Sequence, residues 1–186
     1  VMNNMPSDDA VAQIEAGTLK VTDDWFLTTL KQYAQLRPYM QNGVTGSGTE
    51  AAQQLFASGR AALLATGSFH AGAVRKLGAS FPMDLYAPNT AEAGQGKYEG
   101  VHNATFILGV NARSSHRAAA LAWLTHLADP AVAGAYANGT AQHVTVSGVE
   151  YTDRDLKAFA PWLRKKTLLA PRFQFLNLDV RGAVEN

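Results

Sequence analysis

Residues 56–69 read FASGRAALLATGSF and carry the first α/β unit that the sequence predicts. A helix that Thr49 is predicted to cap leads into this stretch and presents its apolar residues on one face. It ends at Gly59, where a left-handed residue is the common helix terminus. The apolar run 61–65 then has the length of a strand that is covered on both faces. This helix followed by this strand predicts an α/β fold.

Phe69 and His70 come directly after the predicted strand. In open α/β sheets ligands bind at the carboxyl ends of the strands, so both side chains are candidate ligand-binding residues. An aromatic ring offers a sugar an apolar platform, and short polar side chains offer partners to its hydroxyl groups. The alternative for Phe69 is ordinary core packing, and the alternative for His70 is an imidazole on the surface.

The composition describes a chain that folds, with 47% hydrophobic and 17% charged residues in a length of one domain or two small ones. The formal net charge of +1 argues against a nucleic-acid-binding protein. There is no cysteine, which excludes a disulfide scaffold and a thiol nucleophile. No apolar run approaches the ~18 residues of a membrane helix. The chain starts at Val1 without a signal peptide, so we expect its N-terminal part to be removed or to lie outside this sequence.

The second half of the chain repeats the order of strand and helix. Residues 104–110, ATFILGV, form the clearest predicted buried strand, and a serine-capped helix follows over 115–128. A shorter helix over 130–137 ends at the left-handed exit predicted at Asn138-Gly139. The polar segment 89–100 holds three glycines, and we interpret it as a crossing between two lobes, with a surface loop as the alternative. Further predicted elements are helices over 8–16, 23–36, 71–77 and 178–186, and a helix over 153–163 capped by Thr152. A strand is predicted over 81–86, and a strand or extended link over 144–149.

The residues that enzymes use for catalysis are scattered along the chain. The five histidines are dispersed, and His116 and His126, which share a predicted helix, lack the i, i+4 spacing of metal ligands. Neighbouring carboxylates occur at predicted helix starts, where capping and the helix dipole explain them. We therefore predict a protein that is not an enzyme, with no catalytic residue, metal site or cofactor.

The order of these motifs resembles family 1 of the extracellular solute-binding proteins of bacterial ABC importers, the carbohydrate or maltose-binding type. The resemblance rests on residues 56–69, on the Gly-Thr and Thr-Asp pairs of 17–23, and on the strand, serine-rich cap, alanine-rich helix and Asp-Pro of 104–130. In that family the aromatic residue after Gly-Ser is commonly Trp and lines the sugar cleft, whereas here it is Phe69.

The resemblance implies an α/β fold of the periplasmic-binding-protein-like type II class, with two α/β/α lobes joined by a hinge. This chain would be a partial copy that covers roughly the second half. Residues 1–87 would form part of the C-terminal lobe, 88–96 the hinge or crossover linker, 97–142 a segment of the N-terminal lobe, and 143–186 the return to the C-terminal lobe. Without the missing half of the same protein, apolar surface would stay uncovered, so we expect a companion segment.

The resemblance also implies further ligand-binding positions. His102 and Asn103 lie where the family's chain re-enters the other lobe beside the ligand, so both are expected partners of sugar hydroxyl groups, with loop capping as the alternative. Asn177 stands where the maltose-binding type carries a stacking aromatic residue, which argues against a maltodextrin and favours a smaller solute. Arg172 is a candidate partner for an anionic group, with a solvated loop as the alternative. We expect Phe69, His102, Asn103 and Asn177 to converge on one solvent-filled groove.

The function that the resemblance implies is high-affinity binding of a small solute, a sugar or sugar derivative. Delivery to the membrane permease of an ABC importer would follow by hinge closure. The implied location is periplasmic or extracellular and membrane-anchored, in a bacterium. Two other classes of protein stay open. A stand-alone α/β hydrolase or transferase domain predicts a His or Ser within hydrogen-bonding reach of a carboxylate in one pocket. A structural interaction module predicts no deep cleft.

Overall fold

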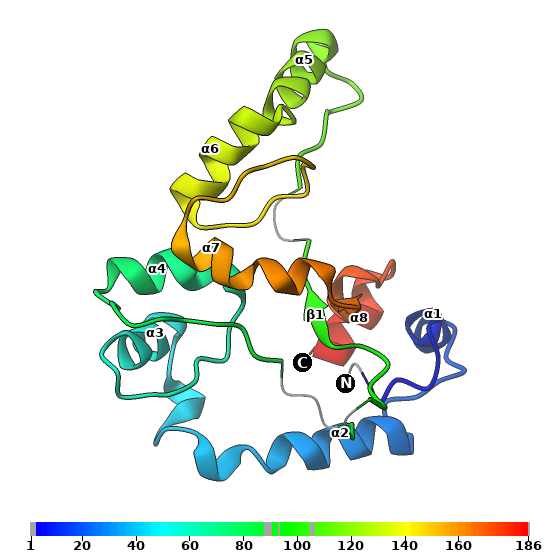
Figure 1. Ribbon diagram of the computed structural model, residues 1–186. Coiled ribbons are helices and arrows are strands. Elements are labelled where there is room, and N and C mark those ends of the chain that lie inside the picture. The colour runs from blue at the N-terminus through cyan, green and yellow to red at the C-terminus, as the bar shows by residue number, and fades with distance from the viewer. Residues whose placement is uncertain (1–2, 88–90, 93, 105–106, 186) are drawn as a thin grey trace. The chain divides into compact units, whose positions relative to one another are not determined.

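The computed structural model describes residues 3–87, 91–92, 94–104 and 107–185 (Figure 1). The chain divides into two units, each built from segments that are far apart in the sequence. Unit 1 comprises Val1–Asn42, Tyr86–Phe106 and Lys165–Asn186, and unit 2 comprises Gly43–Leu85 and Ile107–Arg164. The predicted assignment of segments to the two lobes of a binding protein uses other boundaries and stays a prediction.

In its described residues, unit 1 contains a short parallel sheet and three α-helices. Strands β1 and β2 pair in register, with Gly100 opposite Thr167 and His102 opposite Leu169. The pairing continues beyond the strands, since the Glu99 N–H donates to the Lys166 carbonyl at 2.8 Å. The elements of unit 1 are α1 (Ala10–Glu15), α2 (Asp24–Ala34), a 3-10 turn (Arg37–Tyr39), β1 (Gly100–His102), β2 (Thr167–Leu169), a 3-10 turn (Pro171–Phe173) and α8 (Leu178–Glu185).

Unit 2 is helical in its described part. Its apolar core forms where α3 and α4 pack together around Ala57, Val74 and Ala79, the last two 1% and 5% exposed. Phe56 and Phe81 meet edge to face against this core with ring centroids 5.3 Å apart. The elements of unit 2 are α3 (Thr49–Ala57), α4 (Ala71–Lys76), α5 (Arg117–Leu127), α6 (Pro130–Thr140), α7 (Arg154–Phe159) and 3-10 turns at Val44–Gly46, Ser68–His70 and Ala160–Arg164.

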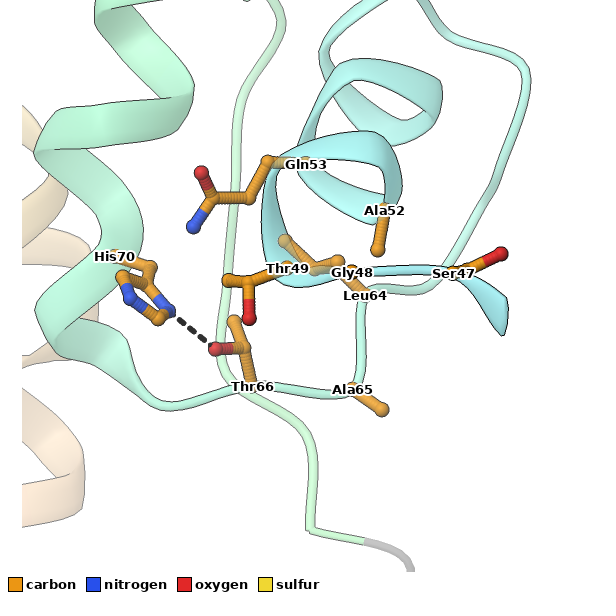
Figure 2. Close-up of a pocket in the computed structure, with 9 residues that line it drawn as sticks. All are labelled: Ser47, Gly48, Thr49, Ala52, Gln53, Leu64, Ala65, Thr66 and His70. Carbon is orange, nitrogen blue, oxygen red and sulfur yellow. Dashed lines mark hydrogen bonds between the residues drawn. The ribbon is translucent and has the colours of Figure 1, made fainter. Parts of the chain in front are cut away.

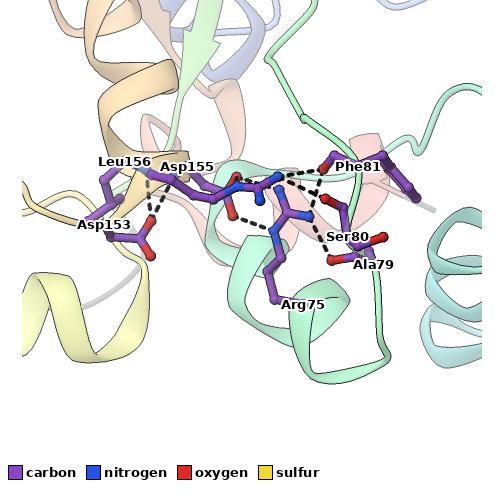
Figure 3. A network of polar contacts seen from close by, with 8 residues as sticks. Arg75, Ala79, Ser80, Phe81, Asp153, Asp155 and Leu156 are labelled. Carbon is purple, nitrogen blue, oxygen red and sulfur yellow. Dashed lines mark hydrogen bonds and ion pairs between the residues drawn. The ribbon is translucent and has the colours of Figure 1, made fainter.

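A polar network connects α4 to α7 within unit 2 (Figure 3). The Arg75 guanidinium donates to both carboxylate oxygens of Asp155, at 2.7 and 2.6 Å. Its remaining terminal nitrogen donates to the carbonyl oxygens of Ala79 and Phe81, both at 2.7 Å. Asp155 is 2% exposed, so the ion pair lies in the interior, and its hydrogen bond raises the pKa of the Arg75 guanidinium.

The helix predictions are confirmed in position and differ at the caps. The predicted terminator Gly59 adopts φ +73°, and Gly78, which ends α4, adopts φ +97°. The predicted caps Thr49 and Thr152 are each displaced by one residue, because Gly48 holds the N-cap position of α3 and Asp153 that of α7. The Asp153 carboxylate accepts from two N–H groups of α7, which a carboxylate does well at a helix start.

The predicted exit of α6 at Asn138-Gly139 is wrong. The helix continues to Thr140, and Ala141 takes the left-handed conformation with φ +54°. The Asn138 side-chain amide instead donates to the carbonyl oxygens of Gly134 and Glu150, at 2.9 and 3.0 Å. These two hydrogen bonds, one within α6 and one to the loop that follows it, stabilise Asn138 inside the helix rather than at its end.

The strand predictions over 61–65, 81–86 and the described part of 104–110 are wrong, and 144–149 is not a strand, which leaves its alternative of a link. Residues 61–65, 81–86 and 144–149 are irregular, and of the predicted strand 104–110 the described residues are irregular too, with 105–106 outside the description. Leu63 and Ile107 are 73% and 76% exposed, so neither run is the buried strand that was predicted. An apolar run of this length is compatible with a strand, but a strand also needs a neighbouring strand to pair with. The described chain provides no such neighbour beside these runs.

Candidate functional site

Residues 64–66, within the stretch 56–69, help to line a pocket in unit 2. The cavity has a volume of about 210 Å³, many times the roughly 10–15 Å³ that one water molecule needs. Two segments line it, the start of α3 with the residues before it and the loop that leads into α4. The lining residues are Ser47, Gly48, Thr49, Ala52, Gln53, Leu64, Ala65, Thr66 and His70.

Polar side chains from both segments are directed into this pocket. Figure 2 shows the side chains of Thr49 and Gln53, from α3, facing those of Thr66 and His70. A short hydrogen bond of 2.6 Å joins Thr66 Oγ1 to His70 Nδ1 and orients the imidazole. Leu64 adds an apolar contact, so the pocket combines hydroxyl, amide and imidazole groups with an aliphatic wall.

The position of His70 follows from the turn that precedes α4. Gly67 precedes a 3-10 turn over Ser68–His70, and α4 begins at the next residue. The Phe69 ring folds back over Gly67, because a Cβ built there would lie 2.1 Å from a carbon of that ring. The two rings of Phe69 and His70 are tilted, with centroids 4.5 Å apart. The turn therefore aims His70 at the pocket, while Phe69 is half-buried beside it and is not a lining residue.

His102 and Asn103 lie in unit 1, at the end of β1. Both are exposed, and the His102 Nδ1 is 3.0 Å from the Thr167 hydroxyl on β2. This cross-strand contact leaves one imidazole nitrogen of His102 directed away from Thr167. Sugar contacts by these two residues stay a prediction.

Arg172 and Asn177 lie near the start of α8 in unit 1. The Arg172 guanidinium carbon is 4.8 Å from the centroid of the neighbouring Phe173 ring, a cation–π distance. The Asn177 Oδ1 accepts from the N–H groups of Asp179 and Val180, at 2.9 and 3.3 Å, so its side chain caps α8. Both side chains are exposed, and capping gives Asn177 a structural role whether or not it binds solute.

The predicted site residues are therefore divided between the units. Phe69 and His70 lie in unit 2, and the other four candidates lie in unit 1. The predicted convergence on one groove stays a prediction. Sequence reasoning missed Thr49, Gln53 and Thr66 as lining residues. One signal was available, because Thr49 and Gln53 are four residues apart on one predicted helix and share its face.

The rival class of a hydrolase or transferase predicted a His or Ser beside a carboxylate in one pocket. Here His70 is paired with the Thr66 hydroxyl instead. Among the described residues, no group of three or more His, Cys, Asp or Glu side chains is placed to hold a metal ion. No helix in the described ranges is long and apolar enough to cross a membrane.

A family model described as bacterial extracellular solute-binding protein matches residues 2–134. The match covers well over half of the chain, so the chain belongs to the family of bacterial extracellular solute-binding proteins. The predicted family is thereby confirmed. Comparison with curated protein sequences and comparison with solved structures gave no match.

Family membership fixes the broad class of function, location and fold. These proteins bind solutes outside the cytoplasmic membrane for ABC importers, and they are generally not enzymes. The family implies a periplasmic-binding-protein-like fold, and the helix-rich units with their small parallel sheet fit a partial copy of it.

Proposed function

We propose that the protein binds a sugar or sugar derivative and delivers it to the permease of an ABC importer by hinge closure. The observation that carries the proposal is the pocket of unit 2, which joins the N-terminal end of α3 to the loop that ends at His70. The residues around it, 47–70, include one of the stretches on which the resemblance to the carbohydrate-binding group rests, 56–69.

The chemistry of the pocket lining favours a ligand that is rich in hydroxyl groups. The Thr49 hydroxyl and the Gln53 amide can each donate and accept hydrogen bonds, and the hydroxyl oxygens of Ser47 and Thr66, which already contact Gly43 and His70, can still accept. Sugar hydroxyl groups both donate and accept, so they can pair with all four side chains. Leu64 offers an aliphatic surface for the C–H face of a sugar ring.

We also propose that the other predicted site residues contact the solute. Phe69 would stack on the sugar once its ring leaves Gly67, and His102 and Asn103 would donate to hydroxyl groups. Arg172 and Asn177 would contact the solute from the segment around α8. Each of these roles is tested by an alanine substitution and a binding measurement.

Hinge closure would couple binding to delivery. A solute that contacts two lobes stabilises only the closed arrangement, so its binding shifts the population toward that state. The closed form would then dock on the permease. We propose that residues 88–96 serve as part of the hinge, and that the remaining half of the protein covers apolar side chains such as Leu63 and Ile107.

Titration calorimetry with mono- and disaccharides, polyols, sugar phosphates and polyamines tests the proposal. We expect at least one sugar or sugar derivative to bind, and Thr66→Ala to weaken its binding about tenfold, since a hydrogen bond to the solute is lost. Thr125→Ala is the matched control, because Thr125 is exposed on α5 and outside the pocket. Binding of polyamines alone, or an equal effect of the two substitutions, would overturn the proposal.

A further inference from the structure

The pocket of unit 2 is bounded on one side by the first turn of α3. Gly48 holds the N-cap position, and no side chain caps this helix of nine residues. The first N–H groups of an α-helix have no acceptor within the helix, and the helix dipole places partial positive charge there. Ser47, Gly48 and Thr49 line the pocket, so this uncapped end faces the cavity. A helix N-terminus of this kind favours an oxyanion.

Gln53 supplies the second, independent observation. It lines the same pocket one turn further along α3, and it is only 6% exposed. No hydrogen bond joins its side-chain amide to any other part of the chain that the structure describes. No fully buried side-chain N or O atom lacks a partner among the described residues, so the Gln53 amide opens onto the pocket, where it can donate to a ligand. Figure 2 shows the Gln53 amide directed toward His70, across the space that a ligand would occupy.

No negatively charged side chain lines the pocket, so its lining would not repel a bound anion. Of the nine described residues that line it, none is Asp or Glu. Glu50, the acidic residue in the first turn of α3, is exposed and is not a lining residue. Thr49 adds a hydroxyl that can donate, and Thr66 adds another in the tautomer where His70 Nδ1 carries the proton of the bond between them. The pocket therefore offers several hydrogen-bond donors at a positively polarised helix end.

From this arrangement we infer that the solute is an acidic sugar derivative whose oxyanion binds at the N-terminus of α3 and to the Gln53 amide. The inference rests on the proposed function and adds the charge of the solute to it. A carboxylate and a phosphate share the chemistry that such a site recognises, since both accept N–H and O–H donors through charged oxygen atoms. The sugar ring would extend from this subsite past Thr66 and His70.

Titration calorimetry with matched series tests this inference. Each series consists of a neutral hexose, its uronate and its 6-phosphate, for glucose, galactose and mannose. We expect one charged member to bind roughly tenfold or more tightly than its neutral parent, because charge-assisted hydrogen bonds and the helix dipole favour it. Tighter binding of the uronate identifies a carboxylate as the oxyanion, and tighter binding of the 6-phosphate identifies a phosphate. Added salt should weaken the binding of the charged member more than that of the neutral parent.

Two glutamine substitutions on α3 provide the matched comparison. Gln53→Glu places a carboxylate in the pocket and should lower the ratio of charged-sugar to neutral-sugar affinity at least tenfold. Gln54→Glu makes the same charge change on an exposed neighbour and should leave that ratio unchanged. Gln53→Leu, which removes the amide without adding charge, should also lower the ratio and serves if Gln53→Glu fails to fold.

The outcomes separate this inference from the function on which it rests. If neutral hexoses bind and neither charged form binds more tightly, the oxyanion subsite is wrong and the sugar-binding function stands. If Gln53→Glu and Gln54→Glu change the affinity ratio equally, the subsite is likewise overturned. If no neutral or charged sugar binds, both the subsite and the proposed function fail.

Discussion

Replacement of Arg75 by Met tests the ion pair between α4 and α7 (Figure 3). Arg75 donates to Asp155 from Nε at 2.7 Å and from Nη2 at 2.6 Å, and from Nη1 to the carbonyl oxygens of Ala79 and Phe81. The Asp155 side chain is 3% exposed. Without Arg75 it keeps only the longer ion pair with Arg154, whose Nε lies 3.7 Å away. The substitution therefore leaves a buried carboxylate poorly compensated.

The expected loss of stability follows from the burial of the Asp155 carboxylate. Removal of one partner from a buried ion pair costs about 3–5 kcal/mol in the free energy of unfolding. For a chain of this length each kcal/mol lowers the melting temperature by about 2–4 °C, so Arg75→Met should lower it by about 6–20 °C. Asp155→Asn should cost less, because it removes the charge, keeps an acceptor oxygen, and leaves Arg75 20% exposed to water.

Urea unfolding followed by far-ultraviolet circular dichroism and tryptophan fluorescence measures both losses. Lys165→Met is the control, since its partner Glu99 is half exposed and surface ion pairs contribute little. The double variant Arg75→Met/Asp155→Leu should be more stable than Arg75→Met alone, because no unpaired charge remains. The reasoning is refuted if Arg75→Met lowers stability no more than Lys165→Met does.

Three further predictions concern stability elsewhere in unit 2. Burial lowers the pKa of His143 below its usual 6.5, so the unfolded chain takes up a proton at a higher pH than the folded chain. The free energy of unfolding should therefore fall as the pH drops below about 6.5. His143→Gln should flatten this dependence in urea titrations at a series of pH values. Gly72→Ala should destabilise by about 1 kcal/mol, because the new Cβ would lie 3.0 Å from the Thr140 carbonyl oxygen, whereas Gly139→Ala meets open space and should stabilise in thermal melts. Asp129→Ala should cost about 1 kcal/mol by the same measurement, because the carboxylate caps α6.

Helix positions were predictable because their determinants are local. A glycine that must adopt positive φ, as Gly59 and Gly78 do, marks a helix end within two residues. The caps were predicted less well, because neighbouring polar residues compete for one position. Asp153 outcompetes Thr152 at the start of α7 since its carboxylate reaches two N–H groups.

Strands were not predictable because pairing is not local. β1 and β2 pair through residues 100–102 and 167–169, which are 67 positions apart, and the β1 segment has only Val101 as a large apolar side chain. The apolar runs that the sequence marked as strands, 61–65 and 104–110, find no partner in the described chain. A pattern of side chains cannot report the neighbour on which a parallel strand depends.

The candidate site was predictable in part for the same reason. His70 was found because it follows directly on a turn after an apolar run. Gln53 was missed because it reaches the pocket through the packing of α3 beside the 64–70 loop, which no local pattern expresses. Phe69 was placed at the right turn, yet its ring packs over Gly67 rather than lining the cavity.

Hydrogen–deuterium exchange with the tightest-binding sugar tests most directly whether the pocket of unit 2 holds the solute. The account predicts slower exchange in peptides that contain residues 47–53 and 64–70 when solute is bound, and unchanged exchange in α5, which is exposed and outside the pocket. A solute that binds and slows exchange elsewhere, with both pocket segments unchanged, would contradict it.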